Sequence, residues 1–186
     1  YRDIKSVLTI HNLKFQGVFP SESLGDLLSL GSSLMMENGV EYYGSVNYMK
    51  GGINYADFVT TVSPTYAEEI RYPYYGEGLH GLMDRISYKL KGILNGIDTE
   101  INDPAKDKAI FANYNVDNLD IKYENKKALQ ETLGLPVSDV PLIAIISRLT
   151  DQKGLDILSP GLEEILSKDL QMVVVGTGDA KYEDTF

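Results

Sequence analysis

Short apolar runs separated by polar stretches predict that strands and helices alternate along this chain. Runs rich in β-branched residues predict strands at residues 7–10, 58–62, 142–146 and 170–175. The most apolar of these runs, residues 142–146, has no polar residue, which is typical of a strand buried on both faces. A further short strand is predicted where residues 92–98 pass into a glycine turn.

Apolar residues at helical spacing predict amphipathic helices between these strands. The first covers residues 21–36, and a second helical period covers residues 46–56. Gly51 and Gly52 interrupt the second period and would let either a neighbouring element or a sugar come close. We favour the packing role. Lys50 beside them is a weak ligand candidate, because a lysine beside a helix is usually solvated.

Capping residues predict where three more helices begin. Ser63, directly before a proline, predicts the N-cap of a helix. Asn125 is predicted to cap a helix that ends before Gly134. Residues 155–166 carry leucines on one face, with Pro160 as a kink or a delayed start.

Together these elements predict an α/β fold with parallel sheets flanked by helices. The strands at residues 142–146 and 170–175 enclose the helix at residues 155–166, which makes a βαβ unit. Such a unit is right-handed, and its two strands are parallel. Residues 99–124 are polar and are expected to form a long surface connection.

Composition excludes several classes of function. The chain is 43% hydrophobic and 24% charged, as in soluble globular proteins. It has no cysteine, which excludes disulfides and thiol chemistry and fits a reducing compartment. A net charge of -10 argues against nucleic acid as a partner, because such binding needs many cations. No apolar stretch is long enough for a membrane and no signal peptide is recognisable, so we expect a cytoplasmic protein.

Two cations mark the first candidate site. Arg148 and Lys153 follow the strand at residues 142–146, at the carboxyl end where open α/β sheets bind ligands. The planar arginine fork and the compact lysine charge suit a diphosphate, and would stabilise charge that grows on it as a bond breaks. Alternatively, both are surface cations, one of them paired with Asp151 or Asp156.

His11 and Asn12 mark a second candidate site with the same geometry. They follow the predicted strand at residues 7–10, again at a carboxyl end. A histidine there can donate a hydrogen bond or position a sugar hydroxyl. Alternatively, its ring is satisfied by the backbone at the end of the strand.

The loop at residues 72–78 is a weaker candidate. Its tyrosines, Tyr72, Tyr74 and Tyr75, either stack on sugar rings or supply buried area. His80 is similarly ambiguous. No spacing of His, Asp and Glu along the chain resembles a metal site.

A glycine turn at residues 176–179 argues against a dinucleotide site. Gly176 and Gly178 look like half of a dinucleotide fingerprint, but Lys181 stands where the third glycine should be, so NAD binding is not predicted. A P-loop is absent too, because Lys153 and Gly154 lack the glycine spacing that cradles phosphates.

One stretch and five shorter ones carry a family resemblance. Residues 147–156 read S-R-L-T-D-Q-K-G-L-D. The shorter stretches are His11-Asn12-Leu13 with Gln16-Gly17, Met49-Lys50-Gly51-Gly52-Ile53 with Ala56-Asp57, the run of residues 60–66, Gly76-Glu77-Gly78-Leu79, and Leu94-Asn95-Gly96-Ile97-Asp98. In this order they resemble the bacterial glycogen synthases and plant starch synthases, retaining glucosyltransferases that use ADP-glucose. The resemblance covers nearly the whole chain.

The resemblance implies the GT-B architecture, in which two Rossmann-like domains enclose a cleft. Residues 1–93 would be the end of the N-terminal domain, and residues 94–186 the start of the C-terminal, nucleotide-sugar-binding domain. Members of the family are much longer. We therefore expect an internal fragment that has little or no transfer activity by itself.

The resemblance also implies roles for individual residues. Arg148 and Lys153 would neutralise the diphosphate leaving group, and His11 would lie beside the transferred glucose. The expected substrate-binding residues are Asn12, Asn95, Gly176 and Gly178. The implied partners are ADP-glucose as donor and an α-1,4-glucan as acceptor, with no metal or other cofactor, since the two cations would do the work of a metal ion.

Two other functions remain open. A UDP-sugar-dependent glycosyltransferase of the same architecture would share the cationic loop but lack the other motifs. A non-catalytic glucan-binding fragment is the second alternative, because this chain lacks parts of both half-sites.

Overall fold

The computed structural model describes residues 3–186, and Tyr1 and Arg2 lie outside the described residues. The chain divides into two compact units, Tyr1–Ile97 and Asp98–Phe186, here called the first and the second unit. Each unit contains parallel strands and helices, as the α/β prediction requires. Every helix within residues 3–186 is too short or too polar to cross a lipid bilayer.

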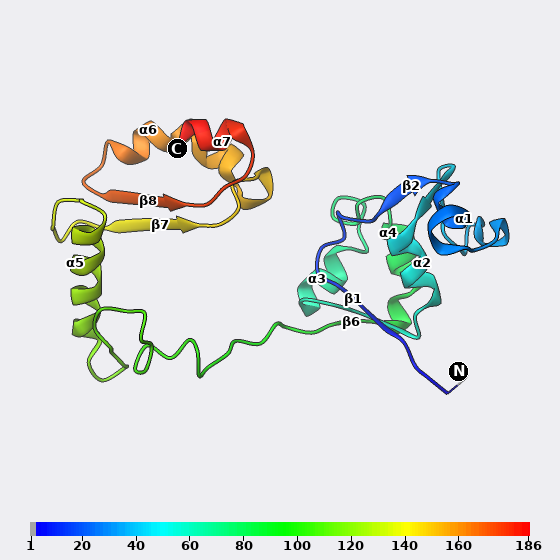
Figure 1. Ribbon diagram of the computed structural model, residues 1–186, viewed down its shortest axis with the longest axis horizontal. Helices are drawn as coiled ribbons and strands as arrows, with labels where there is room; N and C mark the ends of the chain where they lie inside the picture. The colour runs from blue at the N-terminus through cyan, green and yellow to red at the C-terminus, as the bar shows by residue number, and fades with distance from the viewer. Residues whose placement is uncertain (1–2) are drawn as a thin grey trace. The chain divides into compact units, whose positions relative to one another are not determined.

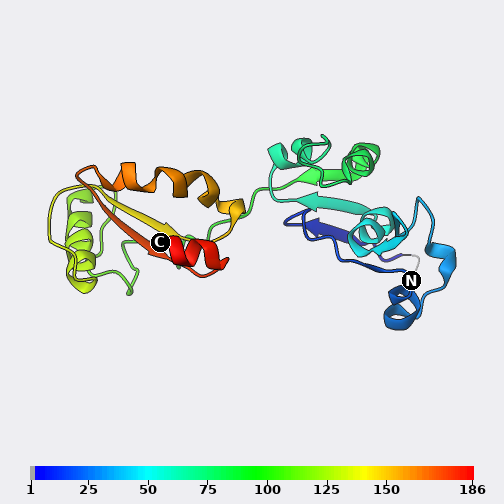
Figure 2. The same ribbon diagram turned by 90° about the horizontal axis from the view of Figure 1, so that it is seen from above.

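A three-stranded parallel sheet forms the centre of the first unit. Its strands lie in the order β1-β5-β6 and point the same way (Figure 2). A small antiparallel sheet has the order β2-β4-β3. The strands are β1 (Val7–Ile10), β2 (Val18–Pro20), β3 (Glu41–Tyr42), β4 (Ser45–Asn47), β5 (Phe58–Thr61) and β6 (Leu90–Gly92), and the helices are α1 (Ser23–Leu28), α2 (Tyr48–Tyr55), α3 (Pro64–Glu69) and α4 (His80–Arg85).

The core of the first unit gathers side chains from the sheet and from the helices beside it. Ile10, Val59, Ile53 and Met83 are all buried in one cluster. Burial of such apolar side chains is the main favourable term in folding. Because Ile10 is the last residue of β1, its burial fixes the point at which the chain leaves the sheet.

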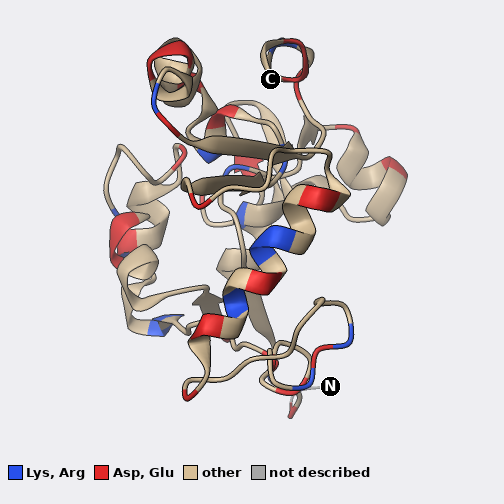
Figure 3. Ribbon diagram, turned by 90° about the vertical axis from the view of Figure 1, so that its left-hand side faces the viewer, with Lys and Arg blue, Asp and Glu red and all other residues tan. Residues whose placement is uncertain are grey.

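The second unit is built on one parallel strand pair. β7 (Leu142–Ile146) and β8 (Gln171–Val175) pair in parallel, and α6 (Leu155–Leu166) joins them, which confirms the predicted βαβ unit. α6 and α7 (Ala180–Thr185) lie over one face of the pair, and α5 (Lys122–Thr132) lies on the other side (Figure 1). α5 carries charges of both signs along its length (Figure 3), as expected for a solvated helix.

Some predicted element boundaries are confirmed. The Ser63 side chain accepts a hydrogen bond from the Tyr66 N–H and caps α3. Gly51 and Gly52 have the predicted packing role. A Cβ added at Gly51 would lie 2.7 Å from Val40 Cγ1, and a Cβ added at Gly52 would lie 3.1 Å from Leu8 Cδ2.

Other predicted boundaries are wrong. The helix predicted at residues 21–36 ends at Leu28, because Ser29 has a left-handed φ of 53° that a helix cannot continue. Asn125 lies inside α5 and does not cap it; its amide instead bonds both the N–H and the carbonyl of Ala112, at 2.9 and 2.7 Å. The strand predicted within residues 92–98 ends at Gly92.

The prediction that residues 142–146 are buried on both faces is also wrong for the described chain. Ile143 is 39% exposed and Ile146 is 78% exposed. A strand face is buried only where another element covers it. Within the described residues β7 pairs with β8 alone, so much of its apolar surface remains accessible.

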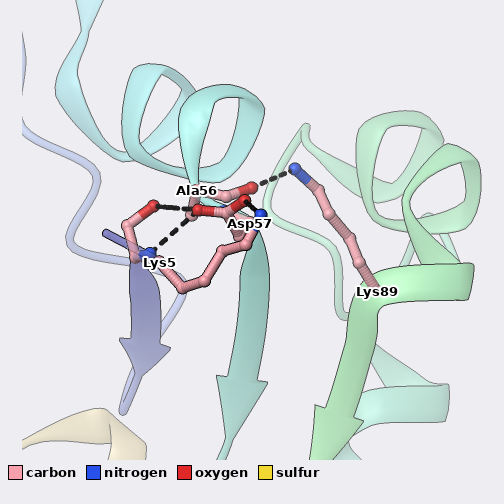
Figure 4. Close-up of polar contacts among 5 residues, drawn as sticks. Lys5, Ala56, Asp57 and Lys89 are labelled. Carbon is pink, nitrogen blue, oxygen red and sulfur yellow. Dashed lines mark hydrogen bonds and ion pairs between the residues drawn. The ribbon is translucent and has the colours of Figure 1, made fainter. Parts of the chain in front are cut away.

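A polar cluster joins the strands of the first unit at the ends opposite to His11. The Asp57 carboxylate accepts hydrogen bonds from the Ser6 N–H (2.9 Å) and from the Ser6 hydroxyl (3.1 Å). It also accepts one from Lys5 Nζ (3.2 Å), as Figure 4 shows. Lys89 Nζ donates to the Ala56 carbonyl at 2.6 Å. The Ser6 amide, followed by Lys5, lowers the pKa of Asp57 because both stabilise the ionised carboxylate.

Two glycines bring the chain after β8 against the chain after β7. The pairing continues beyond both strands, since Leu149 N–H donates to the Thr177 carbonyl (2.9 Å) and Asp179 N–H to the Leu149 carbonyl (2.8 Å). A Cβ added at Gly176 would lie 1.9 Å from the Ser147 carbonyl oxygen. A Cβ added at Gly178 would lie 2.2 Å from the Leu149 carbonyl oxygen. Only glycine fits at such an approach.

We predict that Asp57→Asn lowers the thermal unfolding midpoint of the chain at pH 7, because the charged acceptor is lost. The folded-state pKa of Asp57 is lowered, so its contribution is present above the ordinary pKa of about 3.9 and disappears as the pH falls below it. The difference in unfolding midpoint between Asp57→Asn and the parent chain should therefore become smaller toward pH 3. Circular dichroism at several pH values measures this, and Glu22→Gln, at an exposed position, should change little.

We predict that Gly176→Ala destabilises the second unit by roughly 1–3 kcal/mol, because backbone must move to make room for the methyl group. Amide hydrogen exchange should then show reduced protection of the Leu149 and Asp179 N–H groups. Gly161→Ala is the matched control. No atom lies within 4 Å of its added Cβ, and alanine favours the α6 interior by roughly 0.5–1 kcal/mol. Unchanged protection in Gly176→Ala would contradict the close approach.

Candidate functional site

Arg148 and Lys153 lie on the loop that follows the carboxyl end of β7, and both side chains are exposed. Lys153 is the last residue of a 3₁₀ turn, Asp151–Lys153. Gly154 follows with a left-handed φ of 73° and is the N-cap residue of α6. Among the described residues, neither Arg148 nor Lys153 forms an ion pair. Two cations on one loop therefore remain accessible to an anion.

α7 holds the middle of this cationic loop. Asp151 Oδ1 accepts a hydrogen bond from the hydroxyl of the buried Tyr182 and another from Lys181 Nζ, at 2.8 Å. Asp151 raises the pKa of both groups, because its charge favours the forms that keep their protons. Neither Arg148 nor Lys153 pairs with Asp151, which forms an ion pair with Lys181. Asp151 instead ties the loop to α7.

The glycine turn lies beside the start of the same loop. Gly176 and Gly178 contact the backbone on either side of Arg148, at Ser147 and Leu149. The Gly178 N–H donates to the Glu183 carboxylate at 2.7 Å. The structure thus gathers Arg148, Gly176 and Gly178 at the carboxyl end of the β7–β8 pair.

A hollow of about 420 Å³ lies near this turn, but Arg148 and Lys153 do not line it. Its walls are mostly apolar side chains of α6 and β8, with Phe186 directly after α7. It is a packing hollow under the turn and offers no cation to a ligand. The charged loop, not this hollow, is the chemically suited part of the second unit.

His11 and Asn12 leave β1 on a well-anchored loop. Leu13 is fully buried, and its N–H donates to the Tyr66 hydroxyl at 3.2 Å. His11 is exposed, and its ring has no hydrogen-bond partner within the described part of the chain, so the backbone-satisfied alternative does not hold. Asn12 Oδ1 accepts from the Lys14 N–H at 3.0 Å, which leaves its amide nitrogen able to donate.

The remaining predicted site residue stands apart from these groups. Asn95 is exposed on the stretch after β6, near the end of the first unit, and no hydrogen bond holds its side chain among residues 3–186. His11, Asn12 and Asn95 belong to the first unit, and Arg148, Lys153, Gly176 and Gly178 to the second. No group of three or more His, Asp or Glu side chains in the described chain could hold a metal ion.

Sequence reasoning missed a set of polar residues in the first unit. Gln16 is buried and bonds Asn47 (2.6 Å) and the Glu77 carbonyl (2.7 Å). Lys50 was expected to be solvated, but it is only 9% exposed. The signal in the sequence that could have found it was Gly51, whose missing side chain lets the start of α2 pack against Val40.

Comparisons with known proteins agree with the resemblance found in the motifs. A family model described as the starch synthase catalytic domain matches residues 1–85. Glycogen synthases from Alkaliphilus metalliredigens and Clostridioides difficile are 50% and 53% identical to the chain and cover all of it. The catalytic domain of starch synthase IV from Arabidopsis thaliana, bound to ADP and acarbose, superposes on 97% of the chain with a TM-score of 0.89 and 36% identity.

The matches extend through both units, so they do not depend on any single motif. The chain spans 39% of the length of these two glycogen synthases and 38% of the starch synthase chain. The predicted fold class, portions of a GT-B enzyme with parallel sheets flanked by helices, is confirmed by the structural neighbour. Over the segment that it spans, the chain belongs to the glycogen synthase and starch synthase family.

Proposed function

We propose that this chain contributes to the transfer of glucose from ADP-glucose to the non-reducing end of an α-1,4-glucan, with retention of the anomeric configuration. The observation that carries the proposal is the exposed pair Arg148 and Lys153, which have no ion-pair partner among the described residues and lie at the carboxyl end of a parallel strand pair. Family membership supplies the donor and the acceptor. A related starch synthase was solved with ADP and acarbose.

The chemistry of the proposed site follows from the residue types. Cleavage of the donor leaves ADP, on which negative charge grows in the transition state. Arg148 would bind diphosphate oxygens through its planar fork, and Lys153 would add a point charge to the same group. Groups that are already in place when charge develops stabilise it most. No resident metal is needed for this role, and we propose none.

The other predicted residues have supporting roles in this proposal. His11 would donate a hydrogen bond to a hydroxyl of the transferred glucose, with Asn12 beside it. Gly176 and Gly178 would let the nucleotide approach the backbone next to Arg148. Asn95 would contact substrate. The Asp151–Tyr182 hydrogen bond would hold the cationic loop in one conformation, which reduces the entropy lost on binding.

The two alternatives are separated by different measurements. A UDP-sugar enzyme would bind UDP more tightly than ADP, whereas our proposal requires the reverse. A non-catalytic glucan-binding segment would bind glucan but neither nucleotide. The absence of cysteine and the acidic net charge of -10 support placing the protein in the cytoplasm, with no nucleic acid as a partner.

We predict that Lys153→Ala and Arg148→Ala each weaken ADP binding on the order of tenfold, because each removes a charge-assisted contact to phosphate. Isothermal titration of the chain with ADP measures this. In a protein of the length of the relatives, turnover should also fall by about 100-fold. Lys168→Ala, another exposed lysine of the second unit, is the matched control and should leave both values near those of the parent. Unchanged ADP affinity and turnover in Lys153→Ala would refute the assignment.

A further inference from the structure

The sequence contains two Asn-Gly pairs, and the structure holds them very differently. They are Asn38-Gly39 and Asn95-Gly96. Because glycine has no side chain, an asparagine that precedes it has open access to the next backbone nitrogen. Asparagine is one of the thermolabile residues of proteins, and this access is a reason for it. Each pair is therefore a candidate for a chemical modification that the proposed reaction does not involve.

The reaction open to such a pair is deamidation through a cyclic imide. The glycine backbone nitrogen loses its proton to water and attacks the asparagine Cγ. A new N–Cγ bond forms, the Cγ–Nδ2 bond breaks, and Nδ2 takes up a proton and leaves as ammonia. Water then opens the ring at either carbonyl, which yields aspartate or isoaspartate. The net change is one water consumed and one ammonia released, so no oxidant or enzyme is required.

Ring closure requires a backbone that is free to move. The asparagine backbone must rotate until the next nitrogen reaches Cγ, and that nitrogen must not be held in another hydrogen bond. A pair fixed by hydrogen bonds or packing reacts only after local opening, and the free energy of that opening slows the reaction. The fold therefore determines which of the two pairs reacts.

The pair at Asn38 lies in a turn that holds its glycine on both sides. The Gly39 N–H donates to the Met36 carbonyl at 2.8 Å, and Asn54 Nδ2 donates to the Gly39 carbonyl at 2.7 Å. Gly39 is buried, and a Cβ added to it would lie 2.1 Å from the Leu34 carbonyl oxygen. The attacking nitrogen is thus occupied, and the backbone around it has no room to rotate.

The pair at Asn95 has none of these restraints. Residues 93–98 form neither helix nor strand, and Figure 1 shows the chain leaving β6 as an extended stretch. The last backbone hydrogen bond before the pair is donated by the Ile93 N–H to the Thr61 carbonyl, at 2.8 Å. Asn95 and Gly96 are both exposed, and within residues 3–186 neither forms a hydrogen bond.

We propose that Asn95 is a site of spontaneous deamidation, and that folding directs the reaction to Asn95 and away from Asn38. The product adds a negative charge, and isoaspartate also lengthens the backbone by one carbon atom. Both changes fall directly before the boundary between the two units, at Ile97 and Asp98. Deamidation therefore alters the segment that connects them. Its consequence for catalysis, the loss of a substrate-binding amide, rests on the proposed function, whereas the reaction itself does not.

Peptide mapping by mass spectrometry tests the proposal on the 186-residue chain, incubated in mildly alkaline buffer without nucleotide. In the folded chain, Asn95 should deamidate about tenfold faster than Asn38 or more, because the turn at Asn38 must open first. In concentrated urea the turn is lost, and the two rates should agree within about threefold. Asn38 is thus a matched internal control, since it has the same chemistry in a different structural setting.

Gly96→Ala is a variant that slows the chemistry without disturbing the fold. No atom lies within 4 Å of a Cβ added to Gly96, and its φ is outside the left-handed region. Deamidation at Asn95 should fall roughly fivefold or more, because the methyl group restricts the backbone and shields the attacking nitrogen. The thermal unfolding midpoint and the rate at Asn38 should stay those of the parent chain.

The outcomes separate this proposal from the proposed function. Equal rates at Asn38 and Asn95 in the folded chain would overturn it. So would an Asn95 that reacts in urea and not in the folded chain, or an undiminished rate in Gly96→Ala. Deamidation as expected together with failure to bind ADP would refute the proposed reaction alone.

Discussion

The close approach of two glycines to a neighbouring backbone is the constraint on which the second unit depends. Because Gly176 and Gly178 have no side chain, the parallel pairing of β7 and β8 continues to Leu149. That continuation determines where the chain turns, and therefore where Arg148 emerges. Tyr182 then holds Asp151 on the same loop from α7. Parallel pairing, a turn and one partly buried hydrogen bond thus place the charged loop.

Much of the fold could be predicted from local patterns. The strand at residues 7–10, the βαβ unit and the Ser63 cap follow from periodicity and capping chemistry, which act over a few residues. The predictions were wrong where contacts between segments distant in the sequence determine the structure. Asparagine is a common N-cap residue, but the side-chain amide of Asn125 forms hydrogen bonds to the backbone of Ala112 across a loop. The burial of residues 142–146 depends on what covers the strand, and the strand's own sequence does not contain that information.

The candidate site was predictable in part, for a similar reason. Arg148, His11 and the glycine turn stand directly after strands, so sheet topology alone brings them to carboxyl ends. Lys50 could not be found this way. Lys50 is buried because Gly51 lets α2 approach Val40. Its burial follows from packing between segments that are separate in the sequence.

The Gly178 amide has a further consequence for any anion that enters the turn. Its N–H is already engaged by the Glu183 carboxylate at 2.7 Å. A phosphate oxygen arriving there would exchange one negative partner for another, so the net gain at this amide is small. The Glu183 carboxylate would compete with an entering anion for the Gly178 N–H. Without an anion, this carboxylate satisfies the N–H and helps to order the turn. Affinity for an anion must then come from the side chains around the turn. The backbone of the turn determines where the anion can lie.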